Sequence, residues 1–261
     1  MMWSAATPVA ALVEAYEEGR VASSHSRLGR NRGMMRGRIA WSFMAFFAIA
    51  IAGYGIVYVV IGERMYPPQL LESFRARPWG INPHALFGAL ALITGAAQFS
   101  RAVLQRRRLH RVIGFAYVTA CLVVGTAGTY MAWYSFGGWP THIGFGLLGL
   151  SLLTTTLIAF RQIKRRDIAS HRRWMIRSYS LIFAAVTLRL QLPILIAFFR
   201  AFPPAYTIVA WSSWIPNLAF AELRIRATRA TALDALRPRT PRPRTRFADT
   251  PPAPALDADA T

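Results

Sequence analysis

Four of the five histidines each stand at the start of a successive hydrophobic segment: His84, His110, His142 and His171. If these segments cross a bilayer, consecutive ones run in opposite directions. His84 and His142 then lie near one membrane surface. His110 and His171 lie near the other. Because imidazole is a common axial ligand of haem iron, this placement predicts two bis-histidine pairs, each suited to one b-type haem.

The segments that must position these histidines are long and apolar. Residues 39–62, 78–100 and 112–160 contain no charged side chain, and each exceeds the ~20 residues needed to cross a hydrocarbon core of ~30 Å. Glycines and a proline near residues 137–140 divide the longest run into two helices joined by a turn. Continuous rather than alternating hydrophobicity argues against a membrane β-barrel. We therefore predict an all-α polytopic bundle of six transmembrane helices with a central four-helix core, spanning about 39–62, 83–104, 110–134, 141–161, 173–199 and 203–222.

The chain has a net charge of +20, and its basic residues lie mostly on one side of the predicted membrane spans. With the N-terminus inside, 26 of the 31 basic residues fall in inner segments and four in outer loops. Such asymmetry over short loops orients membrane proteins, and the inner charge also attracts anionic headgroups. We expect a multi-pass protein of the bacterial inner membrane with both termini in the cytoplasm. The lipid bilayer is its partner, and nucleic acid is not.

Three regions are predicted along the chain. Residues 1–38 form a basic cytoplasmic arm, residues 39–225 form the transmembrane domain, and residues 226–261 form a disordered cytoplasmic tail rich in Pro, Arg and Ala. The single cysteine, Cys121, excludes an internal disulfide and attachment of a c-type haem. No paired carboxylates, nucleophile motif or phosphate-binding loop supports a hydrolase or a kinase.

Three of the four histidines share a helix face with small residues. His84, for example, is followed at same-face offsets by Gly88 and Gly95. Small residues allow helices to approach closely, and they also leave room for a flat macrocycle. The alternative is that the stripes pack helices without any cofactor, and that a first-turn histidine contacts headgroups or caps a neighbour.

Two arginines are candidate ligands of haem propionates. Arg189 lies deep in a predicted span, where a charge costs ~2.5–3.5 kcal/mol and usually faces a partner inside the bundle. It follows His171 by 18 residues, ~27 Å along a helix, which places it at the level of His84 and His142. Its guanidinium fork suits a carboxylate; snorkelling to the outer headgroups is the alternative. Arg177 could serve a propionate on the inner side, although positive-inside orientation also explains it.

Several segments resemble a bacterial family of predicted multispanning membrane proteins, Domain of Unknown Function 2306. The resemblance covers roughly residues 40–225 and implies membrane placement but no activity. It rests on NPHALFGALALITGAAQF, LHRVIGFAYV, GFGLLGLSLLTTT, HRRWMIRSYSLIFAAVTLRL and WIPNLAFAE.

The order of the histidines is also similar to that of di-haem cytochromes of the b-561 type. That resemblance implies that the second and fourth spans share one haem and that the third and fifth share the other. His84 and His142 would then form the outer pair. His110 and His171 would form the inner pair. Asn82, shortly before the first histidine, is a further similarity.

These observations predict transmembrane electron transfer through two b-type haems, as in a membrane oxidoreductase or electron carrier. A quinol or small-molecule reductant would supply electrons to an acceptor across the membrane. Two other classes stay open. A cofactor-free transporter or assembly factor would use the histidines and Arg189 to line a polar cavity or proton path. A single histidine pair could instead bind a quinone or a metal.

Overall fold

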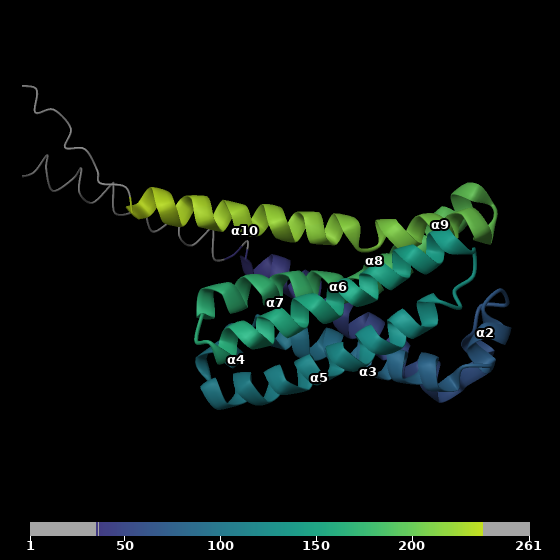
Figure 1. Cartoon of the computed structure of the whole chain (residues 1–261), viewed down its shortest axis with the longest axis horizontal. Helices are drawn as coiled ribbons and strands as arrows, with labels where there is room; N and C mark the ends of the chain where they lie inside the picture. The colour runs from purple at the N-terminus through teal and green to yellow at the C-terminus, as the bar shows by residue number, and fades with distance from the viewer. Residues whose placement is uncertain (1–34, 36, 237–261) are drawn as a thin grey trace, which may run out of the picture. The chain divides into compact units, whose positions relative to one another are not determined.

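The computed structural model describes Met35 and residues 37–236, and that part of the chain is helical and contains no strand (Figure 1). The all-α prediction is confirmed. Most of the predicted basic arm and residues 237–261 of the predicted tail lie outside the described residues. The chain to Leu223 is one compact unit, and the chain from Arg224 is a second unit.

Most of the described residues belong to helices joined by short connections. The first helix covers residues 37–61. It is followed by η1 (Gly62–Met65), α2 (Leu71–Arg75), α3 (Pro78–Gln98), α4 (Arg101–Gln105), α5 (Arg107–Ala132), α6 (Trp139–Lys164), α7 (Ile168–Ile182), α8 (Ala184–Phe199), α9 (Phe202–Ser212) and α10 (Ile215–Leu236).

Five helical segments of the described chain are long and apolar enough to cross a membrane: Gly37–Met65, Pro78–Gln98, Arg107–Ala132, Trp139–Lys164 and Ile168–Phe199. The polytopic prediction is therefore confirmed, whereas the count of six is not. The sixth predicted span, about 203–222, is divided between α9 and α10 by a break at Ser213 and Trp214. The 11 residues of α9 rise only ~16 Å, about half of a hydrocarbon core.

Two other boundaries differ from the sequence prediction. The second span begins at Pro78, five residues before the expected start, and Pro83 lies inside the helix. Proline is well suited to the first helical position, where its missing N–H is not needed. At the other end of the chain, residues 226–236 were assigned to the disordered tail, but they continue α10 as helix.

The predicted turn between the third and fourth spans is confirmed. Gly137 and Gly138 have φ angles of 96° and 75°, a region that side-chain-bearing residues rarely adopt. Trp139 and Pro140 then open α6, with proline in its first turn. This turn fixes α5 and α6 as antiparallel neighbours.

Helices α3, α5, α6 and α7 form the core of the bundle. Each packs against the next in the chain, and α3 also contacts α7 (Figure 1). The first helix lies beside α3, where the indole of Trp41 donates to the Ala96 carbonyl at 3.1 Å. The predicted central four-helix arrangement is thus present, and it contains the segments that carry the four histidines.

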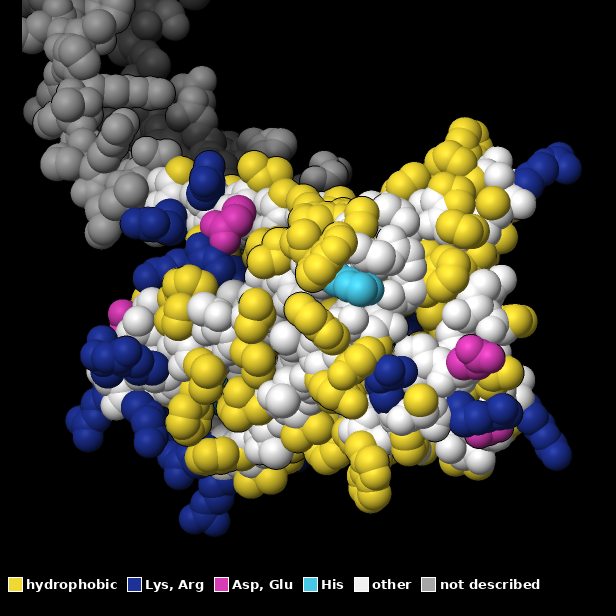
Figure 2. Space-filling model, turned by 45° about the vertical axis from the view of Figure 1, so that its right-hand side comes forward, with side chains coloured by type: hydrophobic (Ala, Val, Ile, Leu, Met, Phe, Trp, Pro, Cys, Tyr) yellow, Lys and Arg dark blue, Asp and Glu magenta, His cyan; other side chains and the backbone are white. Residues whose placement is uncertain are grey.

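The surface of the bundle is apolar along its middle and basic at one end. Figure 2 shows hydrophobic side chains over the middle of the visible face, whereas Lys and Arg gather at the end that carries α4 and the α6–α7 turn. Large hydrophobic side chains such as Phe46 and Ile194 are more than 60% exposed. Exposure of this extent fits contact with lipid rather than water.

Candidate functional site

The inner histidines lie at the starts of α5 and α7, which are at the same end of the bundle (Figure 1). His110 and His171 each occupy the fourth position of their helices. The Nδ1 atom of His171 lies 2.8 Å from the Ala159 carbonyl. Because a carbonyl can only accept, Nδ1 carries a proton, and in the neutral form of the ring Nε2 then has a lone pair. This is the tautomer that a metal-ligating histidine usually adopts.

His110 complements this arrangement. Its Nδ1 atom is buried and has no hydrogen-bond partner among the described residues. The start of α5 is held to the end of α3 by the Gln98 amide, which donates to the His110 carbonyl at 2.8 Å. Asp167 caps α7 by accepting from the Ser170 N–H at 2.8 Å. The two rings are therefore positioned by helix ends that are themselves fixed.

The outer pair is arranged differently. The Nε2 atom of His142 lies 2.9 Å from the Ser135 carbonyl, so this ring closes the turn between α5 and α6. The His84 ring instead packs against Gly128 of α5, where an added Cβ would lie 3.2 Å away, and its Nδ1 is buried without a partner in the described chain. In that part of the chain, no hydrogen bond or ring contact joins His84 to His142.

The glycines on the histidine faces mainly serve close helix packing. A Cβ added at Gly95 would lie 2.8 Å from Tyr117 and closer still to Tyr179. Gly125 and Gly149 face each other across α5 and α6, with 3.4 Å between an added Cβ at Gly125 and the Gly149 carbonyl. Side chains and backbone thus occupy much of the space that the small-residue stripes were expected to leave for a macrocycle.

The Arg189 side chain lies next to the first helix. It donates to the Ala185 carbonyl on its own helix at 3.0 Å, and its guanidinium lies 5.3 Å from the centre of the Tyr54 ring. Tyr58 and His84 are both within its electrostatic range. Across the described residues, no Asp or Glu forms an ion pair with Arg189. Its observed partners are therefore neutral.

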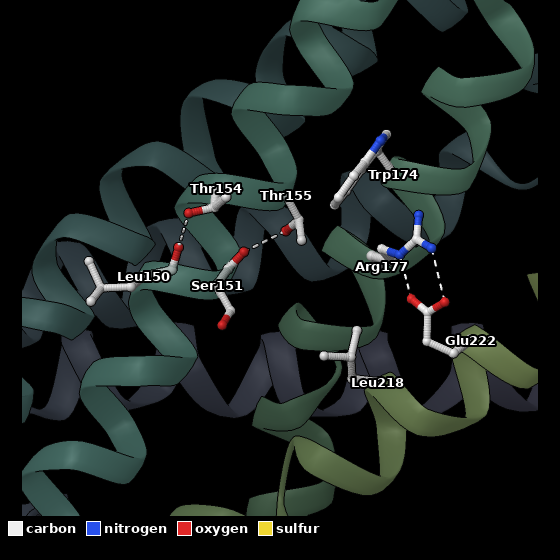
Figure 3. A pocket seen from close by; sticks show the side chains of 8 residues that line it. All are labelled: Leu150, Ser151, Thr154, Thr155, Trp174, Arg177, Leu218 and Glu222. Carbon is white, nitrogen blue, oxygen red and sulfur yellow. Dashed lines mark hydrogen bonds and ion pairs between the residues drawn. The ribbon is translucent and has the colours of Figure 1, made fainter.

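Arg177 has a carboxylate partner that the sequence analysis did not assign. Its guanidinium makes two hydrogen bonds to Glu222, one of them 2.9 Å long between Nη2 and Oε2, and stacks over the Trp174 ring at 4.5 Å. Figure 3 shows the pair at one side of a cavity of about 360 Å³ between α6, α7 and α10. The cavity is lined by Leu150, Ser151, Thr154, Thr155, Trp174, Arg177, Leu218 and Glu222.

A cluster of buried hydroxyls joins α5, α6 and α7 at the centre of the bundle. The Ser178 hydroxyl lies 2.8 Å from the hydroxyls of both Tyr117 and Thr156, and all three side chains are fully buried. The Cys121 thiol lies next to them. The sequence contains a signal for this cluster, because Tyr117 and Cys121 share the helix face of His110, and Ser178 shares that of His171.

Polar side chains also surround the two helix breaks. Asn217 of α10 donates to the Thr187 hydroxyl at 2.9 Å and to the Ser213 carbonyl at 3.1 Å. Gln191 of α8 accepts from the Ser212 hydroxyl at 2.9 Å. Backbone groups released at a break need such partners in a membrane. These contacts connect the broken segments α7–α8 and α9–α10.

The chemistry available to this set of residues is ligation by imidazole and binding of negative charge. Within Met35 and residues 37–236, no three His, Cys, Asp or Glu side chains gather as they would around a protein-bound metal ion. Axial ligation of haem requires only two imidazoles. In the inner pair, the printed hydrogen bonds of His171 leave its Nε2 atom unused, whereas in the outer pair His142 uses Nε2 for a backbone contact.

The comparisons with known proteins bear on the same segment. A family model described as "Predicted membrane protein (DUF2306)" matches residues 81–225. This range includes all four histidines and both Arg177 and Arg189. No curated protein matches the chain, and no solved structure matches it.

Proposed function

The chain belongs to the DUF2306 family of predicted membrane proteins, and we propose that it transfers electrons through b-type haem held between its transmembrane helices. His110 and His171 are the proposed axial ligands at the inner level. His84 and His142 are the proposed ligands of a second haem at the outer level. When bound, haem supplies a one-electron redox centre whose potential is set by its ligands and surroundings.

The observation that carries the proposal is the hydrogen bonding of the ring nitrogens of His110 and His171. The Ala159 carbonyl fixes the proton of His171 on Nδ1 and leaves Nε2 for a metal. At the start of α5, at the same end of the bundle, the buried Nδ1 atom of His110 has no partner in the described chain, and an unsatisfied buried polar atom is costly unless a ligand completes it. The outer pair has weaker support, because ligation there requires His142 to release the Ser135 carbonyl.

We further propose that the protein lies in the bacterial inner membrane with both termini in the cytoplasm. The basic end of the bundle would then face inward. A quinol or small-molecule reductant and an electron acceptor are the proposed redox partners.

A difference spectrum of the purified protein, dithionite-reduced minus oxidised, tests the proposal. We expect sharp b-type bands in protein expressed with ample haem supply. His171→Ala should abolish the inner haem and His142→Ala the outer one, so each variant should retain about half of the absorbance. His25→Ala is the matched control, since that histidine has no assigned role. A colourless wild-type protein would overturn the haem proposal.

A second candidate function is solute transport, and the two helix breaks favour it. Transporters often bind substrate where membrane helices are discontinuous. Here α7–α8 is interrupted at Phe183 and α9–α10 at Ser213 and Trp214, and Asn217 joins the interrupted segments through Thr187. If the purified protein contains no haem, uptake assays in proteoliposomes comparing wild-type protein with Asn217→Ala become the informative measurement.

A further inference from the structure

We propose that Arg189, with His84 and the tyrosines of the first helix, forms a carboxylate-binding site in the outer half of the bundle. The starting point is an imbalance of charge. Arg189 is a permanent cation in a membrane-spanning helix. Within Met35 and residues 37–236, no acidic side chain is paired with it.

The guanidinium also has unused hydrogen-bond donors. It carries five N–H groups, and within the described part of the chain one hydrogen-bond acceptor is found for them, the Ala185 carbonyl at 3.0 Å. Away from water, a charge normally faces a counter-charge or further acceptors. The planar fork of the remaining N–H groups matches the two oxygens of one carboxylate.

The neighbours of Arg189 favour an anion over a second cation. The Tyr54 ring lies 5.3 Å from the guanidinium, and Tyr58 lies within electrostatic range. The Nδ1 atom of His84 on α3 is buried without a partner in the described chain, and its ring packs against Gly128 of α5. None of these three neighbours is an acidic side chain, and so a bound carboxylate would supply the counter-charge that they do not.

Three separate helices reach this site at similar depth. Arg189 precedes the end of α8 by ten residues, His84 follows the start of α3 by six, and Tyr54 precedes the end of the first helix by seven. These offsets correspond to about 15, 9 and 10 Å along their axes. A ligand entering from the side that carries the α5–α6 turn would reach the site before the middle of the membrane.

Two sources could deliver this carboxylate, and they are separable. One is a free organic acid from the outer side. The other is the propionate of a haem on the outer histidine pair. The first source is independent of the proposed haem function, and the second rests on it.

The first experiment measures ligand-dependent thermal stability of haem-free protein in detergent. A maleimide dye that reacts with Cys121, which is fully buried, reports opening of the bundle. Benzoate should raise the unfolding midpoint with the logarithm of its concentration above Kd, by about 3–6 °C at tenfold over Kd, while its neutral analogue benzamide should not. Arg189→Gln should lose the response. Arg200→Gln, which removes an exposed arginine at the end of α8, should keep it.

The second experiment compares haem with its dimethyl ester, which has no free propionate. If the propionate is the ligand, haem should bind wild-type protein more than tenfold more tightly than the ester, and Arg189→Lys should reduce that preference. A response to benzoate or a preference for free propionates supports the site. If wild-type protein shows neither, the site is overturned, whether or not Arg189→Gln folds. Haem binding without ester discrimination, together with no benzoate response, rejects this site while leaving the proposed function standing.

Discussion

Arg177 on α7 and Glu222 on α10 form a bidentate ion pair, although they are 45 positions apart in the chain. Their side chains are 18% and 33% exposed, and Trp174 stacks on the guanidinium. Water therefore screens the pair only partly. The pair holds the first turns of α10 to the core helix that also carries His171.

Glu222→Gln should lower the free energy of unfolding by about 1–3 kcal/mol, because it leaves the shielded charge of Arg177 without a counter-charge. Glu63→Gln is the matched control. The Glu63–Arg75 pair has similar bidentate geometry but is 53–58% exposed, and water and salt screen an exposed pair so that it contributes little to stability. Denaturant unfolding in detergent measures both variants. Equal losses for the two would show that the Arg177 pair is no better shielded than the surface pair.

The Ser178 hydroxyl connects two others, those of Tyr117 and Thr156, so its removal leaves both without this partner. We expect Ser178→Ala to destabilise the protein by about 1–3 kcal/mol. Thr154→Ala should cost little, since the Thr154 hydroxyl is exposed and bonds only to the Leu150 carbonyl of its own helix. Thermal unfolding followed by tryptophan fluorescence compares them. A Ser178 variant as stable as the Thr154 variant would contradict a structural role for the cluster.

Much of the fold follows from features that act locally along the chain. The length of the apolar segments correctly predicted five spans, because a helix that crosses a hydrocarbon core needs a minimum number of residues. Gly137 and Gly138 predicted the turn before α6, since both adopt positive φ. The alternation of helix direction also predicted that His110 and His171 lie at one level, and the starts of α5 and α7, which carry them, lie at the same end of the bundle (Figure 1).

The remaining features depend on contacts that no local pattern encodes. The sixth span looked continuous because residues 203–222 contain no charge before Glu222, yet the chain breaks at Ser213 and Trp214. The sequence left His142 either as a haem ligand or as a first-turn histidine that contacts headgroups or caps a neighbour, and it gave no sign of the contact between Nε2 and the Ser135 carbonyl at 2.9 Å. Helical periodicity gives the face of a residue but not the partner that its side chain reaches.

Gly95 should tolerate no larger residue. In Gly95→Ala the new methyl group would lie 2.8 Å from Cε2 of Tyr117 and even closer to the Tyr179 ring, so buried aromatic rings would have to move. Overpacking of this kind costs about 1–3 kcal/mol. Gly53→Ala is the control, because nothing lies within 4 Å of its added Cβ and alanine favours helix by about 0.5–1 kcal/mol. Relative to the wild-type protein, Gly95→Ala should lower the unfolding midpoint and Gly53→Ala should raise it. A stabilised Gly95 variant would contradict the close contact of α3 with α5 and α7.

The orientation of the bundle predicts which thiols an impermeant maleimide can reach in intact cells. Cys121 is fully buried, so the native thiol should not react and single cysteines can be added to the natural chain. Trp79→Cys, at a side chain 90% exposed near the start of α3, should be labelled from outside. Arg106→Cys, in the basic connection before α5, should be labelled only after the cells are permeabilised. The positive-inside distribution is the physical reason, because arginine-rich loops resist translocation. Labelling at position 106 but not at position 79 in intact cells would reverse the assigned orientation, and with it the side from which a carboxylate would approach Arg189.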